Sequence, residues 1–294
     1  RCERRSRIME HPAELSVYSF LAKAMSGKAS VSKDIMDQVA TDVSNALDKQ
    51  FNGKPRDEFK LRMSNVGRPK CQLWFEKNDP EDKIPFPPHF LINMLLGDIV
   101  EAVFKGLLRA SGVQFEDNNN ITLKLGDDKE IQGEYDLVLD GKIDDIKSAS
   151  PWSYNNKFVN FHTLQQGDSF GYIPQLVGYA KGADKEVGGW WVVNKGTGQF
   201  KYVNASSVNS KEVLDNIEET YDYINNDEPF ERCFDAIEET FYKKPTGNKK
   251  LTTECGFCSY KHKCWPTLQT RPSLVSQARE KPMIDYVQIG KEVA

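Results

Sequence analysis

Two acidic side chains and one lysine are spaced so that a short β-hairpin would gather them. Asp136 precedes the pair Asp140-Gly141, which is a strong signal for a two-residue hairpin turn, and Asp145 and Lys147 follow it. Side chains alternate between the two faces of a strand, so Asp145 and Lys147 project from the same side. With Asp140-Gly141 as the turn, Asp136 falls opposite Asp145, and with the turn one residue later it faces Lys147. Both registers place all three side chains on one face.

Such a face predicts a divalent metal site. Two carboxylates directly opposed across strands destabilise a hairpin unless a cation lies between them, and Lys147 is only a partial answer. Mg²⁺ prefers carboxylate, carbonyl and water oxygens, and a metal held there could bind a phosphate and activate a water for in-line attack. Lys147 would then orient that water or stabilise the developing charge. Taken alone, the motif is equally compatible with a hairpin whose charged face is simply solvated.

The elements that must position these residues follow from the periodicity of apolar side chains. Helical spacing predicts helices at about 32–51, 89–110, 164–181, 210–225 and 229–242. Alternation predicts strands at 121–125, 130–140, 142–148, 190–194 and 200–204. This order predicts an α/β fold. We expect residues 1–29 to be an N-terminal extension without regular structure, residues 30–270 to form one domain with its core at about 89–205, and residues 271–294 to be a tail.

The hairpin residues resemble a known family. Asp136 followed by Asp145-Ile146-Lys147 resembles motifs II and III of the PD-(D/E)xK nuclease superfamily. The resemblance implies a restriction-endonuclease-like core, in which helices flank a mixed central sheet. It also implies that Asp136, Asp145 and the Ile146 carbonyl bind Mg²⁺ or Mn²⁺ while Lys147 assists the attack.

Two further segments extend the resemblance over residues 97–179. The pair Gln175 and Tyr179 is similar to the QxxxY motif of the RecB-like branch, and on a helix these two side chains share one face. The segment from Gly97 to Glu101 resembles motif I, which supplies one more metal ligand. Many members have His where this chain has Glu101, itself a sound Mg²⁺ ligand. Gln175 and Tyr179 would support the site or contact DNA.

Cysteine spacing predicts a second metal site. Cys255-x2-Cys258 is a chelating pair, and Cys264 follows it closely. Together with the distant Cys71, this pattern resembles the iron–sulfur nucleases, among them the AddB nuclease domain and the CRISPR adaptation nucleases. The resemblance implies a structural 4Fe–4S cluster that ties together segments before and after the nuclease motifs. Zinc is the alternative, held by the same four cysteines or locally with His262.

The remaining candidates are weaker. Cys2 and Cys233 are spare, and Cys233 is expected to be a small buried residue in a helix. Trp152, Tyr154 and Tyr172 follow the lysine motif and could stack on single-stranded bases, or belong to the core. A lysine-rich tract from residue 243 to 263, which includes Lys249 and Lys250, could follow a phosphate backbone, or be a solvated loop.

Composition bounds the function. The chain has 294 residues, of which 39% are hydrophobic and 28% charged, with a net charge of −4. No apolar run approaches the length of a membrane span and no signal peptide is evident, so we expect a cytoplasmic protein, either cellular or encoded by a phage and acting in its host. The resemblance implies an exonuclease acting on DNA ends, plausibly single-stranded, in recombination, repair, phage replication or CRISPR adaptation, with a partner protein from such a system. An inactive DNA-binding module and an RNA-processing nuclease are the alternatives.

Overall fold

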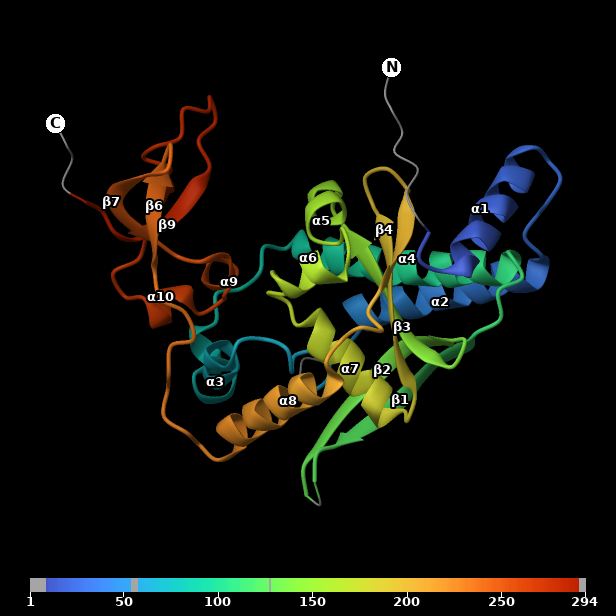
Figure 1. Ribbon diagram of the computed structural model, residues 1–294, viewed down its shortest axis with the longest axis horizontal. Coiled ribbons are helices and arrows are strands. Elements are labelled where there is room, and N and C mark those ends of the chain that lie inside the picture. Colours follow the sequence, from blue (N-terminus) through green and yellow to red (C-terminus); the bar gives the residue numbers. More distant parts are fainter. Residues whose placement is uncertain (1–8, 54–57, 127, 291–294) are drawn as a thin grey trace. The chain divides into compact units, whose positions relative to one another are not determined.

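The computed structural model describes residues 9–53, 58–126 and 128–290. The chain divides into two compact units, drawn in Figure 1. The first consists of Arg1–Asp57, Leu61–Gly67 and Pro87–Glu218, and the second of Glu58–Lys60, Arg68–Phe86 and Glu219–Ala294. Both units are therefore assembled from segments that are separated along the chain, rather than from one continuous domain with a tail.

A five-stranded mixed sheet is the centre of the first unit. Its strands, in spatial order, are β1 (Glu116–Lys124), β2 (Glu130–Leu139), β3 (Lys142–Ala149), β4 (Glu186–Asn194) and β5 (Phe200–Asn204). The pair β3–β4 is parallel and the other three pairs are antiparallel. The chain passes from β3 to β4 through helices, as parallel neighbours require.

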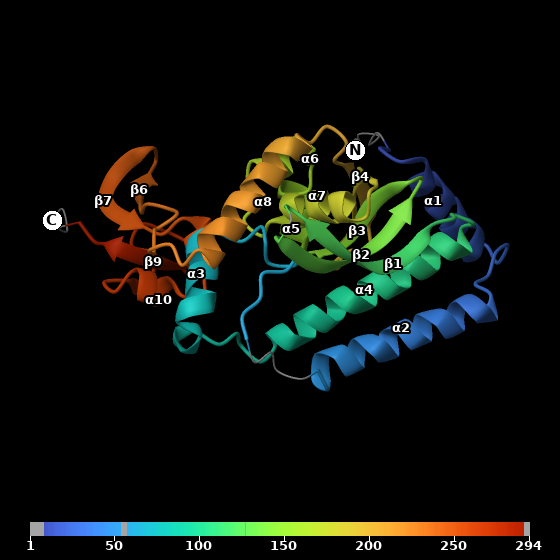
Figure 2. The ribbon, with the colours of Figure 1, turned by 90° about the horizontal axis from the view of Figure 1, so that it is seen from below.

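Helices cover both faces of this sheet. The helices of this unit are α1 (Pro12–Met25), α2 (Lys33–Phe51), α4 (Phe90–Ala110), α5 (Pro151–Asn156), α6 (Phe161–Gln165) and α7 (Tyr172–Gly182), of which α1 and α2 pack on α4. Helix α8 (Ser210–Asn225) begins in the first unit and ends in the second. Figure 2 shows α4 between the sheet and α2, with α7 on the opposite side of the strands; α4 packs on β3, and α7 packs on β1, β3 and β4. The predicted α/β class, a mixed central sheet flanked by helices, is confirmed.

The principal core lies on the α4 side of the sheet. Phe104 and Leu108 of α4 pack with Trp191 of β4 and with alternate residues of β2, and Val17 of α1 joins the same cluster. The apolar side chains that alternate along the strands and those that recur at helical spacing on α4 thus face one another in a single core layer. The opposite faces of β2 and β3 are left to carry Asp136, Asp145 and Lys147.

A buried carboxylate closes a β-bulge behind this site. Between β3 and β4, two glycines, Gly188 and Gly189, stand opposite the single residue Asp144. Asp144 is 1% exposed, and its carboxylate accepts hydrogen bonds from Gly189 N (2.9 Å), Trp191 Nε1 (3.0 Å) and the Tyr202 hydroxyl (2.8 Å). A Cβ added at Gly188 would lie 2.0 Å from Asp144 Oδ1, so only glycine leaves room for this arrangement.

Asp144 is expected to make stability depend on pH. Burial outweighs the three donors and raises the pKa of Asp144 from 3.8 to about 7. Because the folded state holds this proton more tightly than the unfolded state, its contribution to stability is greatest below pH 4. It falls, by on the order of 4 kcal/mol in total, as the pH rises to about 7.

The measurement is urea unfolding of the wild type and of Asp144→Asn between pH 4 and 8. Asp144→Asn cannot ionise, so the free energy of unfolding of the variant minus that of the wild type should rise through this window. Asp215→Asn is the matched control, because Asp215 is an exposed partner of Lys211 on α8. A difference for Asp144→Asn that stays flat across the window would contradict the assignment.

The second unit contains a four-stranded antiparallel sheet of order β6-β7-β9-β8 and several short helices. Its elements are α3 (Lys70–Asn78), η1 (Pro80–Asp82), β6 (Ile237–Phe241), β7 (Lys244–Lys250), α9 (Thr253–Gly256), α10 (Lys261–Cys264), β8 (Gln269–Pro272) and β9 (Met283–Gln288). Buried Glu239 accepts hydrogen bonds from the Tyr286 hydroxyl (2.8 Å) and from Asn248 Nδ2 (2.8 Å), and so fixes β6, β7 and β9 together.

Several local predictions are wrong. Residues 229–242 have helical spacing, but the chain is irregular there and then forms β6, because pairing with β7 overrides local propensity. The single helix at 164–181 is two helices, separated by a turn in which Gly171 has φ 73°. The segment 1–29 contains α1, while residues 1–8 lie outside the described part, and the supposed tail 271–294 supplies β9. Among the described helices, none has the length and apolarity needed to cross a bilayer.

Candidate active site and cysteine site

The β2–β3 hairpin adopts the first of the two expected registers. Asp140 and Gly141 form its turn with φ 51° and 76°, and Leu139 pairs with Lys142. Continuing the ladder past the Leu137–Asp144 pair puts Asp136 across from Asp145. Asp136 Oδ2 accepts a hydrogen bond from the Ile146 N–H at 2.7 Å, which fixes its carboxylate against β3.

Lys147 connects the hairpin carboxylates to α7. Its Nζ lies 2.9 Å from Asp145 Oδ1, 2.8 Å from Asp145 Oδ2 and 3.2 Å from Gln175 Oε1. Gln175 Nε2 in turn donates to the Tyr179 hydroxyl at 3.1 Å. The two α7 residues therefore lie on one face, as expected; Gln175 contacts the lysine directly, while Tyr179 contacts Gln175 and is itself buried, at 4% exposed.

Glu101 reaches the same region from α4, but it is held by a lysine one turn further on. Lys105 is 4% exposed, and its Nζ lies 2.8 Å from Glu101 Oε1 and 3.4 Å from Asp117 Oδ1. Arg109 also pairs with Asp117. The buried ammonium of Lys105 offsets part of the negative charge that Glu101 brings to the site.

The electrostatics of the site indicate an excess of buried negative charge. Burial, and then the proximity of Asp145 and Glu101, raise the pKa of Asp136 well above its usual range. Burial also raises the pKa of Asp145, although Lys147 opposes this shift. The same pairing raises the pKa of Lys147 despite its burial, so the lysine stays protonated at any working pH. A further cation would stabilise both carboxylates in their ionised form.

These residues border one open cavity of about 1040 Å³. The six residues expected at the active site all line it: Glu101, Asp136, Asp145, Lys147, Gln175 and Tyr179. Ile146 also lines it, and because its side chain belongs to the core, its backbone is what faces the cavity. Lys49, Arg62 and Lys195 add positive charge around the carboxylates. A wide cavity with this charge pattern fits a polyanion better than a small neutral ligand.

The donor set fits a hard divalent cation. Buried Asp145 Oδ2 accepts no well-directed hydrogen bond, although Lys147 Nζ is near it, and an unsatisfied carboxylate oxygen is what a metal would bind. Glu101, Asp136 and Asp145 do not bring their oxygens within 4.8 Å of one another, since in the described residues only Asp79, Glu81 and Asp82 do. Asp136 and Asp145 would hold the ion, and Glu101 would join them on leaving Lys105.

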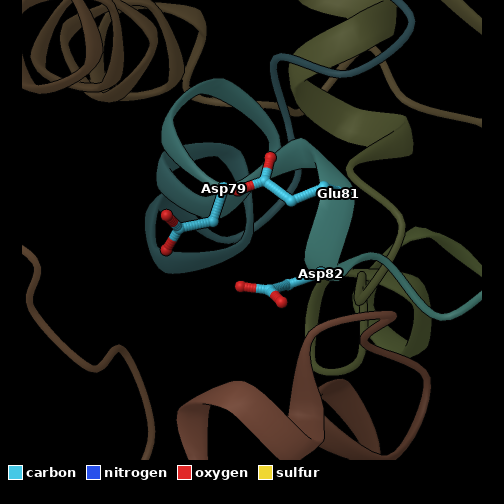
Figure 3. Close-up of side chains that lie close together, drawn as sticks. All are labelled: Asp79, Glu81 and Asp82. Atoms are coloured by element: carbon cyan, nitrogen blue, oxygen red, sulfur yellow. The ribbon is translucent and has the colours of Figure 1, made fainter.

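The acidic group at η1 has a simpler explanation. Figure 3 shows the side chains of Asp79, Glu81 and Asp82 close together, and Glu81 and Asp82 are exposed. Lys263 Nζ lies 2.6 Å from Asp82 and 3.7 Å from Asp79. These ion pairs link η1 to α10, the helix that carries Cys264.

Four cysteines from two separate stretches of the chain, both in the second unit, line one pocket. Cys71 comes from α3, Cys255 from α9, Cys264 from α10, and Cys258 from the turn between α9 and α10. Phe75, Phe234 and Trp265 complete its largely apolar lining. These are the four residues expected to bind a cluster.

The pocket disfavours free thiolates but supplies donors for bound ones. Burial raises the pKa of Cys255 and raises that of Cys258 to about 11, while hydrogen bonding to Cys233 and burial raise that of Cys71. The Tyr260 N–H donates to Cys258 Sγ at 3.4 Å, and Arg232 Nε donates to Cys264 Sγ at 3.5 Å. A bound metal ion ionises such thiols, and these donors would stabilise the sulfurs.

Neither Cys233 nor His262 lines the cysteine pocket. Cys233 is exposed and outside any helix, so the prediction of a small buried helical residue is wrong. Its Sγ accepts a hydrogen bond from Cys71 N at 3.0 Å, but it does not line the pocket. His262 is exposed and does not line the pocket either. Cys2 lies outside the described residues.

Some of the residues expected to contact nucleic acid are accessible at the cavity or the surface, and others are not. Tyr172 lines the cavity and Trp152 is 70% exposed, so both are accessible. Tyr154 is 8% exposed and covered by Lys201, whose Nζ lies 4.2 Å from its ring, so its assignment as a DNA contact is wrong. Lys249 and Lys250 are on β7 of the second unit, whereas the cavity belongs to the first.

Some residues of the cavity were missed by sequence reasoning. Lys105 had an available signal, because it lies four residues after Glu101 on an otherwise apolar helix face. Lys49, Arg62 and Lys195 had none, since each comes from a segment with no motif of its own.

Comparisons with known proteins do not indicate a function for this chain. No protein-family model matches the chain, and no curated protein matches it. A similar solved structure is described as the crystal structure of SSO0001, with 13% identity, a TM-score of 0.41, and coverage of 78% of this chain and 95% of that chain. A likeness at this level carries no argument about the function.

Proposed function

We propose that this protein is a metal-dependent deoxyribonuclease of the PD-(D/E)xK type that hydrolyses phosphodiester bonds with Mg²⁺ or Mn²⁺. One observation carries the proposal: Asp136, Asp145 and Lys147 lie together on one face of a hairpin and line an open cavity with Glu101, Gln175 and Tyr179. The resemblance of these same residues to the superfamily motifs, in the same order along the chain, also supports it.

Each residue has a distinct role in this mechanism. Asp136, Asp145 and the Ile146 carbonyl would hold the ion, and Glu101 would complete the set; the metal would supply a polarised phosphate and a water of lowered pKa. Lys147, protonated and 2.8 Å from Asp145 Oδ2, would donate to a non-bridging phosphate oxygen where negative charge develops. Because its pKa is raised, it cannot be the base that takes a proton from water. Gln175 and Tyr179 would hold the lysine in position.

For the cysteine site we propose a structural 4Fe–4S cluster bound by Cys71, Cys255, Cys258 and Cys264. Zinc would need four sulfurs about 3.8 Å apart around one ion, as its tetrahedral bonds dictate. In the described residues no three cysteine sulfurs lie within 4.8 Å of one another, and His262 is outside the pocket. A cubane holds its cysteines farther apart, because each sulfur binds a different iron, and this favours iron–sulfur over zinc.

The test is digestion of end-labelled single-stranded and duplex DNA with Mg²⁺, Mn²⁺ or EDTA. The proposal expects cleavage with either metal and none with EDTA, and RNA of the same sequence should be cut more slowly. Intact DNA under every condition, with binding retained, would favour the alternative of an inactive DNA-binding module. Faster cleavage of RNA would favour an RNA-processing nuclease. We further propose that the protein acts in the cytoplasm, on DNA ends, with a partner from a recombination or CRISPR system.

A further inference from the structure

We infer that Cys233 and Cys71 are the site of a reversible disulfide, which forms when the cysteine pocket holds no metal and the protein meets a peroxide. The disulfide would link the two stretches of the second unit in place of the bound metal. The inference takes from the proposed metal site only that Cys71 is a ligand when the pocket is filled. It gives a function to Cys233, the one described cysteine that does not line the pocket.

The fold places the two sulfurs side by side, although Cys71 and Cys233 are 162 positions apart in the chain. Cys71 is the second residue of α3, and its N–H donates a hydrogen bond to the Cys233 Sγ at 3.0 Å. The Cys71 thiol also hydrogen-bonds to the Cys233 sulfur. An S–S bond is about 2.05 Å long, so the sulfurs must come closer before it forms. Cys233 lies outside any helix or strand, and a small adjustment of its side chain and backbone can supply this movement.

Contacts outside the pocket hold α3 against the stretch that carries Cys233. Trp74 Nε1 donates a hydrogen bond to the Glu228 carbonyl at 2.8 Å, and the Trp74 ring lies 5.4 Å from that of Phe230. None of these three residues lines the cysteine pocket. Their contacts therefore do not depend on a bound metal, and they keep Cys233 beside Cys71 when the pocket is first emptied.

The different exposure of the two sulfurs sets the order of the chemical steps. Cys233 is exposed, whereas Cys71 is 8% exposed, so hydrogen peroxide reaches Cys233 first. The Cys233 sulfur attacks one peroxide oxygen and breaks the O–O bond, which leaves a sulfenic acid and one water. The Cys71 sulfur then attacks the Cys233 sulfur, forms the S–S bond and releases the second water. In total, two thiols are oxidised to one disulfide while one hydrogen peroxide is reduced to two waters, and a thiol reductant reverses the bond by exchange.

The position of this disulfide determines its effect on the fold. A bond between Cys255 and Cys258 would join residues three apart on one stretch of the chain. A bond between Cys71 and Cys233 joins α3 to the stretch that continues into the second sheet, and closing so long a loop strongly restrains the unfolded chain. The disulfide would therefore keep the second unit folded without metal, and it would withhold the Cys71 sulfur from a new metal until a thiol reduces it.

The test is oxidation of the purified full-length protein, reduced and handled without oxygen, by hydrogen peroxide in the presence of a metal chelator. Mass spectrometry of unreduced peptides should find the peptide of Cys71 linked to that of Cys233, and dithiothreitol should separate them. Hydrogen exchange of the oxidised protein should show retained protection in 237–288. That protection should be lost when dithiothreitol is added with the chelator still present, and the same oxidation should abolish it in Cys233→Ser.

Met283→Leu is the matched control, because it removes another exposed, oxidisable sulfur from the second unit, and it should behave like the wild type. The inference is overturned if Cys71 is linked to a different cysteine, if the wild type forms no link at Cys71, or if oxidation removes protection from the wild type and Cys233→Ser alike. Purified protein without iron would overturn only the cluster proposal, because the linked peptides are measured on the metal-free chain.

Discussion

Lys147→Gln is expected to lower the rate of DNA cleavage by about 10³-fold while leaving DNA binding within a few-fold of the wild type. The ammonium of Lys147 lies between Asp145 and Gln175 in the cavity, where it would meet the phosphate charge that develops during attack. Glutamine keeps hydrogen-bonding capacity but not the charge. The measurement is single-turnover cleavage, with binding determined separately in Ca²⁺.

Lys195→Gln is the control for this experiment. Lys195 lines the same cavity, but its Nζ contacts Asn93 Oδ1 at 3.4 Å, and it is exposed. Losing it should weaken binding in a salt-dependent way, by roughly the contribution of one phosphate contact, without lowering the single-turnover rate at saturation. If Lys147→Gln and Lys195→Gln had the same small effect, Lys147 would be another phosphate contact and the catalytic assignment would be wrong.

The pH dependence should identify the role of the lysine more closely. Because pairing with Asp145 and Asp136 raises the pKa of Lys147, no loss of activity from its deprotonation is expected at any pH where the protein is folded. The carboxylates behave oppositely: their raised pKa values mean that activity should fall as pH decreases through a range well above that of exposed aspartate. Metal binding should move that range toward lower pH, since a cation favours the ionised form of both carboxylates.

The sequence predicted the site better than its surroundings because the site is local. Asp136, Asp145 and Lys147 lie on adjacent strands joined by a two-residue turn, so alternation and turn chemistry suffice to place them. Gln175 and Tyr179 are one helical turn apart, and the same reasoning places them on one face. The register of the β2–β3 hairpin depended on which two residues form the turn with φ above zero. Asp140-Gly141 was the better candidate for that turn, and both residues have positive φ.

The errors occur where distant segments decide the structure. Residues 229–242 are helical in pattern, yet Glu239 is held by Asn248 and Tyr286, which no local window contains. Tyr154 could not be recognised as buried without knowing that Lys201 of β5 covers it. Cys233 is exposed and does not line the pocket that the other four described cysteines share, a distinction that spacing along the chain cannot express.

Cys71→Ser is expected to remove the bound metal and unfold the second unit while the first stays folded. The strands of the second sheet have four to seven residues each, and the cysteine pocket joins the α3 segment of this unit to its α9–α10 segment. Binding energy at a four-thiolate site, about 10 kcal/mol for zinc peptides, appears as folding energy when no site exists in the unfolded chain. Hydrogen exchange should therefore show lost protection in 237–288 and retained protection in 130–149.

Cys233→Ser provides the matched control, because Cys233 lies beside Cys71 but outside the pocket, with its Sγ 3.0 Å from Cys71 N. Protein purified without oxygen should contain four irons per chain and absorb visible light in the wild type and in Cys233→Ser, and neither property should remain in Cys71→Ser. If the wild-type protein were colourless and contained one zinc per chain, the metal would be zinc rather than an iron–sulfur cluster, while the assignment of the cysteine ligands would stand. Loss of the metal from Cys233→Ser with retention in Cys71→Ser would instead show that Cys233, and not Cys71, is the fourth ligand.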